Sequence, residues 1–203
     1  MASGCDTATK MTPERIQALR SGGYTFIGRY LRNLTEEEVQ LITKSGLYIV
    51  SIFEENPTHR EYFTAAQGKK DAAEAIKLAK QLGQTPGKPI YFTVDFDAKE
   101  EEVEGCINVY LQAVKVEFDS NIDNREKHYT LGLYGSGAVL VRFRNIFTYT
   151  WLAGASAWRG SKGYTGWSLK QHANGTVINC GAETFPIDKD ESNGEGGGWR
   201  FHG

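Results

Sequence analysis

Short apolar segments alternate with longer amphipathic segments along nearly all of the 203-residue sequence. The apolar segments are rich in β-branched and aromatic residues, which favour strands, whereas the amphipathic segments place apolar residues at helical spacing. Strands that alternate with helices are typical of parallel βα units, in which each helix crosses back over the sheet. The strands predicted in this way cover residues 4–7, 24–31, 47–53, 89–96, 129–134, 150–157, 167–172 and 185–188.

Capping residues mark where several helices begin. Thr12 precedes Pro13, and Thr35 is followed three residues later by Glu38, which predicts a capping box. Two longer amphipathic segments predict helices over residues 63–82 and 100–118. Little helical sequence separates the last three strands, so the helices in the second half of the pattern are expected to be short or missing.

Eight strands with helical crossovers could form an open doubly wound sheet or a closed barrel. The first turn, residues 6–9, has none of the glycines of a dinucleotide-binding fold. The sequence therefore favours an α/β fold in which residues 1–203 form a single domain. We expect a compact TIM-like (β/α)8 barrel with short or missing helices in its C-terminal third.

The charge balance limits the classes of partner. The chain has 23 Lys and Arg against 25 Asp and Glu, a net charge of −2, which lacks the basic excess of nucleic-acid binders. No segment approaches the roughly 18 apolar residues that cross a membrane, and the first residues lack the basic and apolar regions of a signal peptide. We expect a monomer that binds neither nucleic acid nor membrane.

Acidic residues follow the predicted strands repeatedly. Asp6, Glu54, Asp95, Asp97 and Asp188 each come at the end of an apolar segment. Burying a lone charge is costly, so carboxylates placed repeatedly beside buried strands call for a functional explanation. The C-terminal ends of parallel barrel strands meet at one rim, where barrel enzymes carry their active sites. We therefore expect these five side chains to share one cleft.

Among these acids, Asp95 and Asp97 form the pair whose spacing most specifically suggests catalysis. Side chains alternate along a strand, so both would point to the same side, roughly 6.5–7 Å apart. Crowded carboxyl groups push their pKa values apart, leaving one protonated and one ionised, as glycoside hydrolysis requires. The alternative is a turn into the helix expected at residue 100, with Asp97 as a cap.

Aromatic and amide side chains accompany the acids. Tyr134 and Trp158 end predicted strands, and Gln171 lies on the seventh strand. Sugar rings stack on aromatic faces while polar side chains bind their hydroxyls, so these three residues are candidates for substrate binding. Trp151 and Trp167 fit the core better.

Metal and redox chemistry have little support in the sequence. The four histidines and three cysteines show no metal-ligand or C-x-x-C spacing, so we expect no metal and no cofactor. Cys5 and Cys180 are predicted to lie near each other, because the first and last strands of a closed barrel are neighbours. Free, partly buried thiols are nevertheless favoured over a disulfide.

Several segments, in this order and spacing, resemble the bacterial glycoside-hydrolase-like domain family, whose members are (β/α) barrels related to the family 25 lysozymes. The resemblance extends from Gly4 to about Asp190. It rests on residues 4–7 (GCDT), 26–30 (FIGRY), 49–54 (IVSIFE), 66–72 (AQGKKDA), 90–97 (IYFTVDFD) and 132–135 (GLYG).

The resemblance implies specific site residues. In the lysozyme relatives, carboxylates on strands one, four and eight line the site, which here match Asp6, Asp95, Asp97 and Asp188. Asp97 stands where those lysozymes have a glutamate acid, and it is one methylene shorter. Glu54, which the closer family places at the end of strand three, is the candidate replacement. The acid is thus expected to be Glu54 or Asp97.

The resemblance also implies a function. We expect a glycoside hydrolase that acts on cell-wall polysaccharide, peptidoglycan first, by a two-carboxylate mechanism. The alternatives are a barrel that binds wall glycans without cleaving them and an enzyme of another class on the same fold. Such a substrate implies a secreted or wall-associated protein, exported as part of a longer chain or by a separate route.

Overall fold

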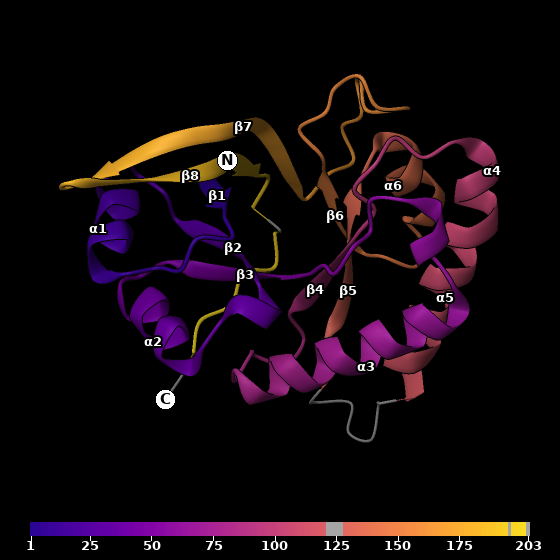
Figure 1. The fold of residues 1–203 in the computed structure, drawn as a ribbon, viewed down its shortest axis with the longest axis horizontal. Helices are drawn as coiled ribbons and strands as arrows, with labels where there is room; N and C mark the ends of the chain where they lie inside the picture. Colours follow the sequence, from indigo (N-terminus) through magenta and orange to yellow (C-terminus); the bar gives the residue numbers. More distant parts are fainter. Residues whose placement is uncertain (121–127, 195, 202–203) are drawn as a thin grey trace.

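Eight strands close into a barrel in the order of the sequence, which confirms the predicted fold (Figure 1). The computed structural model describes residues 1–120, 128–194 and 196–201. Strands β1 to β6 are mutually parallel, as expected when helices connect them. The strands are β1 (Ala2–Asp6), β2 (Phe26–Tyr30), β3 (Tyr48–Phe53), β4 (Pro89–Thr93), β5 (Thr130–Gly135), β6 (Tyr149–Leu152), β7 (Leu169–Cys180) and β8 (Glu183–Ser192).

The helices cover the barrel unevenly. They are α1 (Pro13–Ser21), α2 (Glu36–Lys44), α3 (Ala65–Gln81), α4 (Glu100–Glu102), α5 (Asn108–Ser120) and α6 (Gly137–Phe143), with short 3-10 turns at Leu31–Asn33 and Arg60–Tyr62. The hydroxyls of Thr12 and Thr35 cap their helices as predicted, because they accept hydrogen bonds from first-turn amides. The Glu38 side chain pairs with Arg29 and does not complete the predicted capping box. Between β6 and β8 the described residues contain no helix, as the sequence predicted.

The helix predicted over residues 100–118 is interrupted. A π-helical segment, Val103–Ile107, separates α4 from α5, and Gly105 within it has non-helical angles of φ −92° and ψ −106°. Glycine has no Cβ and adopts such a conformation easily, so the break falls there.

Strand β8 is antiparallel to both of its neighbours, β7 and β1, which the sequence did not predict. The predicted segments 167–172 and 185–188 were also too short, because β7 and β8 form a long hairpin that continues past the barrel over α1 (Figure 1). Arg15 of α1 pairs with Glu183 at 3.1 Å and lies over the ring of Phe185. These contacts hold the projecting end of the hairpin.

The hairpin separates the two cysteines that were expected to be close. Cys5 is opposite Lys189 in the sheet, whereas Cys180 is opposite Glu183 near the hairpin's tip. All three cysteines are free. The prediction rested on the first and last strands being neighbours, which they are, but Cys180 lies at the far end of β7 in the projecting part of the hairpin.

An apolar plug fills the inside of the barrel. It is made by Phe26, Val50, Ile52, Tyr91, Trp151 and Leu169. Tyr91 and Trp151 meet edge to face, with ring centroids 5.4 Å apart. A Cβ atom at Gly28 would lie 2.7 Å from the Trp151 ring, so glycine is needed for the ring to fit. The plug closes the barrel beneath the C-terminal ends of the parallel strands.

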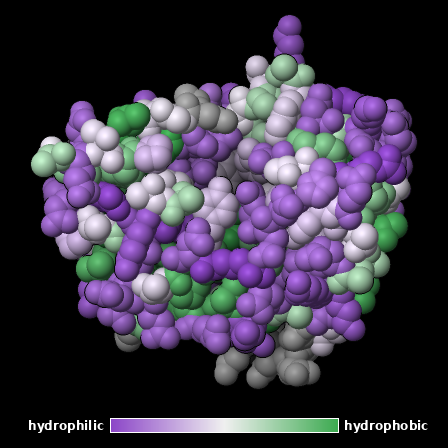
Figure 2. Space-filling view, viewed as in Figure 1, coloured by the Kyte–Doolittle hydropathy of each residue, from purple (hydrophilic) through white to green (hydrophobic). Residues whose placement is uncertain are grey.

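The surface is mainly polar. Hydrophilic residues cover most of the face in Figure 2, with apolar residues in separate patches. None of the described helices combines the length and apolar character needed to cross a membrane.

Candidate active site

A pocket opens at the C-terminal ends of the parallel strands, above the apolar plug. It contains about 490 Å³ of empty space, including its solvent-open mouth. Its lining residues come from every strand of the barrel or from the residue or two after a strand. They are Asp6, Tyr30, Ile52, Glu54, Thr93, Asp95, Tyr134, Trp151, Gln171 and Asp188.

The structure brings together most of the residues predicted from the sequence. Six of the eight candidates line the pocket: Asp6, Glu54, Asp95, Tyr134, Gln171 and Asp188. Their positions agree with the expected cleft, while their catalytic and binding roles remain predictions. Asp97 and Trp158 are not among the lining residues.

Asp97 lies outside the pocket because β4 ends at Thr93. The alternation of side chains therefore stops before Asp95, and the expectation that Asp95 and Asp97 point to the same side is wrong. Asp97 is exposed, and its Oδ1 accepts a 2.7 Å hydrogen bond from the backbone N–H of Arg159. Its carboxylate thus caps a surface loop, close to the alternative of a structural turn.

Trp158 is displaced for a similar reason. Strand β6 ends at Leu152 instead of continuing to residue 157, so Trp158 lies in a loop beyond the strand end. Its backbone N–H donates to the carbonyl of Ala155 in a tight turn, and its side chain is partly exposed. The prediction that Trp158 binds substrate therefore has no support from the pocket.

Asp188 reaches the pocket by another route than the one predicted. It lies within antiparallel β8, opposite Asp6, and not at the end of a parallel strand. The register of β7 shifts between residues 173 and 176, and the N–H of Gly175 donates to Asp188 Oδ1 at 2.6 Å. Gly175 has φ +69°, a left-handed conformation suited to glycine. The bulge therefore fixes the carboxylate of Asp188.

Gln171 connects four groups of the site. Its Nε2 donates to Asp6 Oδ2 at 2.8 Å and to Asp188 Oδ2 at 3.3 Å. Its Oε1 accepts from the N–H of Gly154 at 3.1 Å and from the Tyr134 hydroxyl at 3.2 Å. Only one orientation of the amide satisfies these partners, and the side chain is only 5% exposed. Gln171 therefore holds two carboxylates in place.

A buried acid beneath Asp6 was not among the site residues predicted from the sequence. Asp190 is 4% exposed; its Oδ1 accepts a 3.0 Å hydrogen bond from Trp151 Nε1, and its carboxyl group shares a hydrogen bond with Asp6. Burial, and then the charge of Asp6, raise the pKa of Asp190 far above its ordinary value. Asp190 therefore keeps its proton and donates it to Asp6, because two buried carboxylates cannot both be ionised in contact.

Asp6 also has a raised pKa. Burial raises the pKa of Asp6 to about 7, although the hydrogen bond from Gln171 favours the charged form and opposes the rise.

The sequence contained a signal for Asp190, since residues 188 and 190 of a strand share one face. Trp151, interpreted as core, is buried as expected and also lines the pocket, together with Tyr30 and Thr93.

Glu54 can also hold a proton near neutral pH. Burial, and then the charge of Asp95, raise its pKa to about 7, and the nearby Thr93 hydroxyl offsets part of the rise. The pKa of Asp95 is also raised by burial, and the nearby Tyr134 hydroxyl offsets part of the rise. The two acids thus stand in different environments, as a proton donor and a charged partner require.

A buried ion pair supports the loop that carries Asp6. The side chains of Arg29 and Glu38 are fully buried and 2.9 Å apart. Arg29 Nη1 donates to the carbonyl of Thr7, and Glu38 Oε1 accepts from the N–H of Met11 at 3.0 Å. Both contacts fix the segment after β1. The described residues contain no group of three or more His, Cys, Asp or Glu placed to hold a metal ion.

Comparisons with known proteins agree with the fold. Residues 17–197 match the model of the Rv2525c-like, glycoside hydrolase-like domain. The uncharacterized protein YbfG of Bacillus subtilis (strain 168) is 34% identical over 216 residues, which span 97% of this chain and 29% of that protein. The chain thus spans less than a third of the length of this relative.

Solved structures share the barrel at lower identity. The Tat-secreted protein Rv2525c of Mycobacterium tuberculosis, in complex with L-tartrate, has a TM-score of 0.77 at 20% identity over 98% of both chains. A family 25 glycosyl hydrolase from Bacillus anthracis has a TM-score of 0.54 at 12% identity, over 96% of this chain and 89% of that one. The likeness confirms the barrel fold.

Proposed function

Because the chain belongs to the Rv2525c-like, glycoside hydrolase-like domain family, we propose that it hydrolyses glycosidic bonds of cell-wall polysaccharide, peptidoglycan first. One observation carries this proposal: Glu54, whose pKa is raised to about 7, lines the same pocket as Asp95 and Asp6. Glycoside hydrolysis needs one protonated and one ionised carboxyl group beside the scissile bond.

Glu54 is the proposed general acid. Near neutral pH it is partly protonated, so it can protonate the oxygen of the leaving sugar and still release its proton readily. Asp97, the other candidate for the acid, accepts a hydrogen bond from the Arg159 loop outside the pocket. Glu54 lines the pocket and has a side chain one methylene longer than that of an aspartate.

Asp95 is the proposed anionic partner, and Asp6, whose pKa is about 7, adds charge as it ionises. The transition state of glycoside hydrolysis carries positive charge on the sugar ring, which nearby carboxylates stabilise. Asp95 stands beside Glu54, and Asp6 is oriented by Gln171, so their charges flank the same space. Tyr134, which borders both acids, offers a partly open aromatic surface for a sugar ring.

The test compares two adjacent glutamates. Glu54→Gln should lower the release of reducing ends from purified walls by about 10²–10⁴-fold, the usual contribution of a general acid. Glu55→Gln is the matched control, because Glu55 pairs with Arg32 and is not a lining residue of the pocket. Equal rates for both variants would contradict the role of Glu54.

A glycan-binding barrel without hydrolysis is the second candidate. The observation that favours it is the position of Asp97, which occupies the place of the lysozyme acid in the sequence but caps an exposed loop. Binding of wall glycan without any release of reducing ends by the unmodified protein would select this candidate.

We also propose that the domain acts outside the membrane. A wall substrate requires it, and the related Rv2525c is described as Tat-secreted. The curated relative YbfG is more than three times as long, so the proposed role is that of one module in a larger wall-directed protein. Detection of the full-length protein in the wall fraction of its native cells, with none in the cytosol, tests this placement.

A further inference from the structure

The pocket has a one-sided charge. Four of its lining residues carry carboxyl groups, namely Asp6, Glu54, Asp95 and Asp188, and none is Lys, Arg or His. A fifth carboxyl group, that of Asp190, lies directly behind Asp6. A carboxylate that leaves water needs a positive partner or hydrogen-bond donors. Here Gln171 and the Gly175 N–H donate to Asp6 and Asp188, but these donors carry no positive charge.

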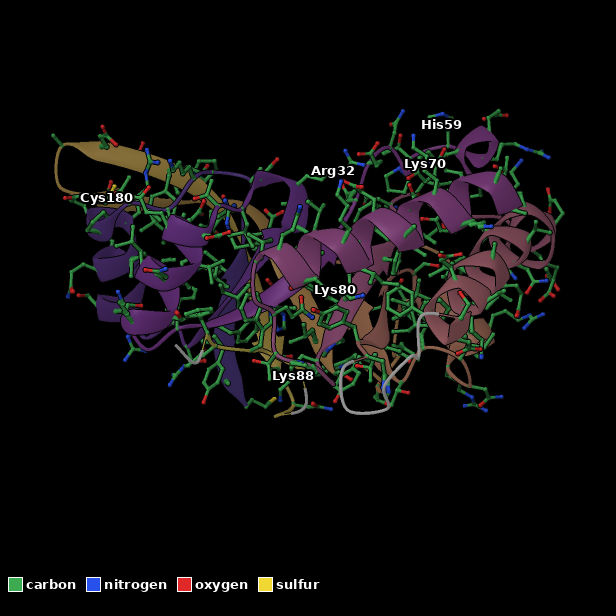
Figure 3. All side chains as sticks on the ribbon, turned by 90° about the horizontal axis from the view of Figure 1, so that it is seen from below. Arg32, His59, Lys70, Lys80, Lys88 and Cys180 are labelled. Carbon is green, nitrogen blue, oxygen red and sulfur yellow. The ribbon has the colours of Figure 1, made fainter. Side chains whose placement is uncertain are left out.

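Basic side chains near the rim are paired elsewhere. Arg32 pairs with Glu55, and Arg159 pairs with Glu100 at 3.1 Å. His172 lies 2.9 Å from Glu191 on the next strand. Within the described ranges, no ion pair joins any of the four pocket acids to a basic residue. Lys70 and Lys80 lie on the outer side of α3 (Figure 3).

An unsatisfied hydroxyl group also faces this space. Thr93 is only 4% exposed and lines the pocket, yet no hydrogen bond of ordinary geometry satisfies its Oγ1 among the described residues. Buried polar atoms normally have a partner, so an orphan that lines an open pocket indicates a polar ligand group. The hydroxyl lies beside the Glu54 carboxyl group, so a polar ligand group in the pocket would reach both.

We propose that the pocket selects a sugar unit with a free, protonated amine, a de-N-acetylated hexosamine, over its N-acetylated form. The inference rests on the proposed function for the sugar itself. An ammonium group brings a positive charge and three donors to carboxylates that have no cation of their own. An N-acetyl group brings no charge, offers one donor, and adds a carbonyl oxygen that needs a donor.

The aromatic lining fits the same ligand. Tyr30 and Tyr134 border the acids and are partly open to the pocket. A tyrosine ring attracts a cation to its face and also stacks on the apolar face of a sugar ring. A hexosamine with a free amine presents both surfaces at once.

The first experiment measures binding calorimetrically with the Glu54→Gln variant, which prevents turnover. Glucosamine and N-acetylglucosamine oligomers of equal length are compared over about pH 5 to 7, so that the sugar amine is protonated over part of the range and the pocket acids ionise over the rest. We expect the amine form to bind at least about tenfold more tightly, as a charge-assisted contact provides. Equal or tighter binding of the N-acetylated oligomer overturns the inference.

A matched pair of aspartates tests whether the pocket carboxyl groups cause the preference. In the same background, Asp95→Asn should reduce the preference for the amine severalfold, because it removes a lining carboxylate. Asp97→Asn makes the same charge change two residues away, outside the pocket, and should keep the preference. Retained preference in both variants would overturn the assignment to this pocket.

A third arm separates two sources of ammonium. The diamino acid of a wall peptide also carries one, so Nα-acetyl-lysine amide serves as the probe. If Nα-acetyl-lysine amide displaces the bound glucosamine oligomer only weakly, the result supports a sugar amine as the ligand. If it displaces the bound oligomer as strongly as unbound glucosamine oligomer does, the inference is overturned. Cleavage is followed separately with the unmodified protein. Absence of cleavage counts against the proposed hydrolase, while the binding ratio alone decides the amine preference.

Discussion

The amide of Gln171 meets the carboxylate of Asp6 at 2.8 Å across 165 residues of sequence. The contact joins the first strand of the barrel to the seventh, which are brought close because β8 is inserted between them in antiparallel orientation. Since Gln171 also reaches Asp188, one neutral side chain orients two acids that would otherwise repel each other.

Gln171→Glu should destabilise the protein and abolish its activity. The change removes both N–H donors and places another carboxyl group between Asp6 and Asp188. Loss of buried hydrogen-bond partners costs about 1–3 kcal/mol for each group left unsatisfied. Urea unfolding measures the effect, with Gln17→Glu on the exposed face of α1 as the control. Equal stability of the two variants would contradict the bridging role.

Asp190→Asn should be tolerated far better than Asp190→Ala. An asparagine can accept from Trp151 with its oxygen and donate to Asp6 with its nitrogen, as the protonated acid does. Alanine leaves both partners unsatisfied and opens a cavity, so we expect a loss of about 2–4 kcal/mol in the free energy of unfolding. Equal destabilisation by both changes would show that Asp190 is ionised in the folded protein.

Stability should decrease as pH rises from about 4 to about 7. The pKa of Asp6 rises from 3.8 to about 7 on folding, so the folded state holds a proton that the unfolded chain has lost over this interval. Bound protons in the folded state make the free energy of unfolding fall with pH. The melting temperature of the unmodified protein, minus that of Asp6→Asn, should fall across this window. A flat or rising difference would contradict the shift.

Cleavage by the unmodified protein should decline above about pH 7. Glu54 has a pKa of about 7, so it loses the proton that a general acid must donate as pH passes that value. The profile of kcat/KM against pH reports this ionisation in the free enzyme. Asp95→Asn should move the decline to lower pH, because the charge of Asp95 is one cause of the raised pKa. An unmoved profile would indicate another acid.

Local pattern alone determined a large part of this protein. The alternation of apolar and amphipathic segments predicted the eight strands, and Thr12 and Thr35 marked two helix starts correctly. Asp6 and Glu54 were placed at the rim correctly because each ends, or directly follows, a parallel strand. These features depend on neighbours in the chain, which the sequence displays directly.

Tertiary structure decided the rest. The end of β4 at Thr93 separated Asp95, in the pocket, from Asp97, on the Arg159 loop. Strand β8 runs antiparallel, and its register with β1 places Asp188 opposite Asp6. The same register brings the protonated carboxyl group of Asp190 into hydrogen-bonding contact with Asp6. Such contacts depend on the register between strands distant in sequence and on which carboxyl groups are buried together. Neither quantity is encoded in the spacing of residues along the chain, so only the closed barrel fixes them.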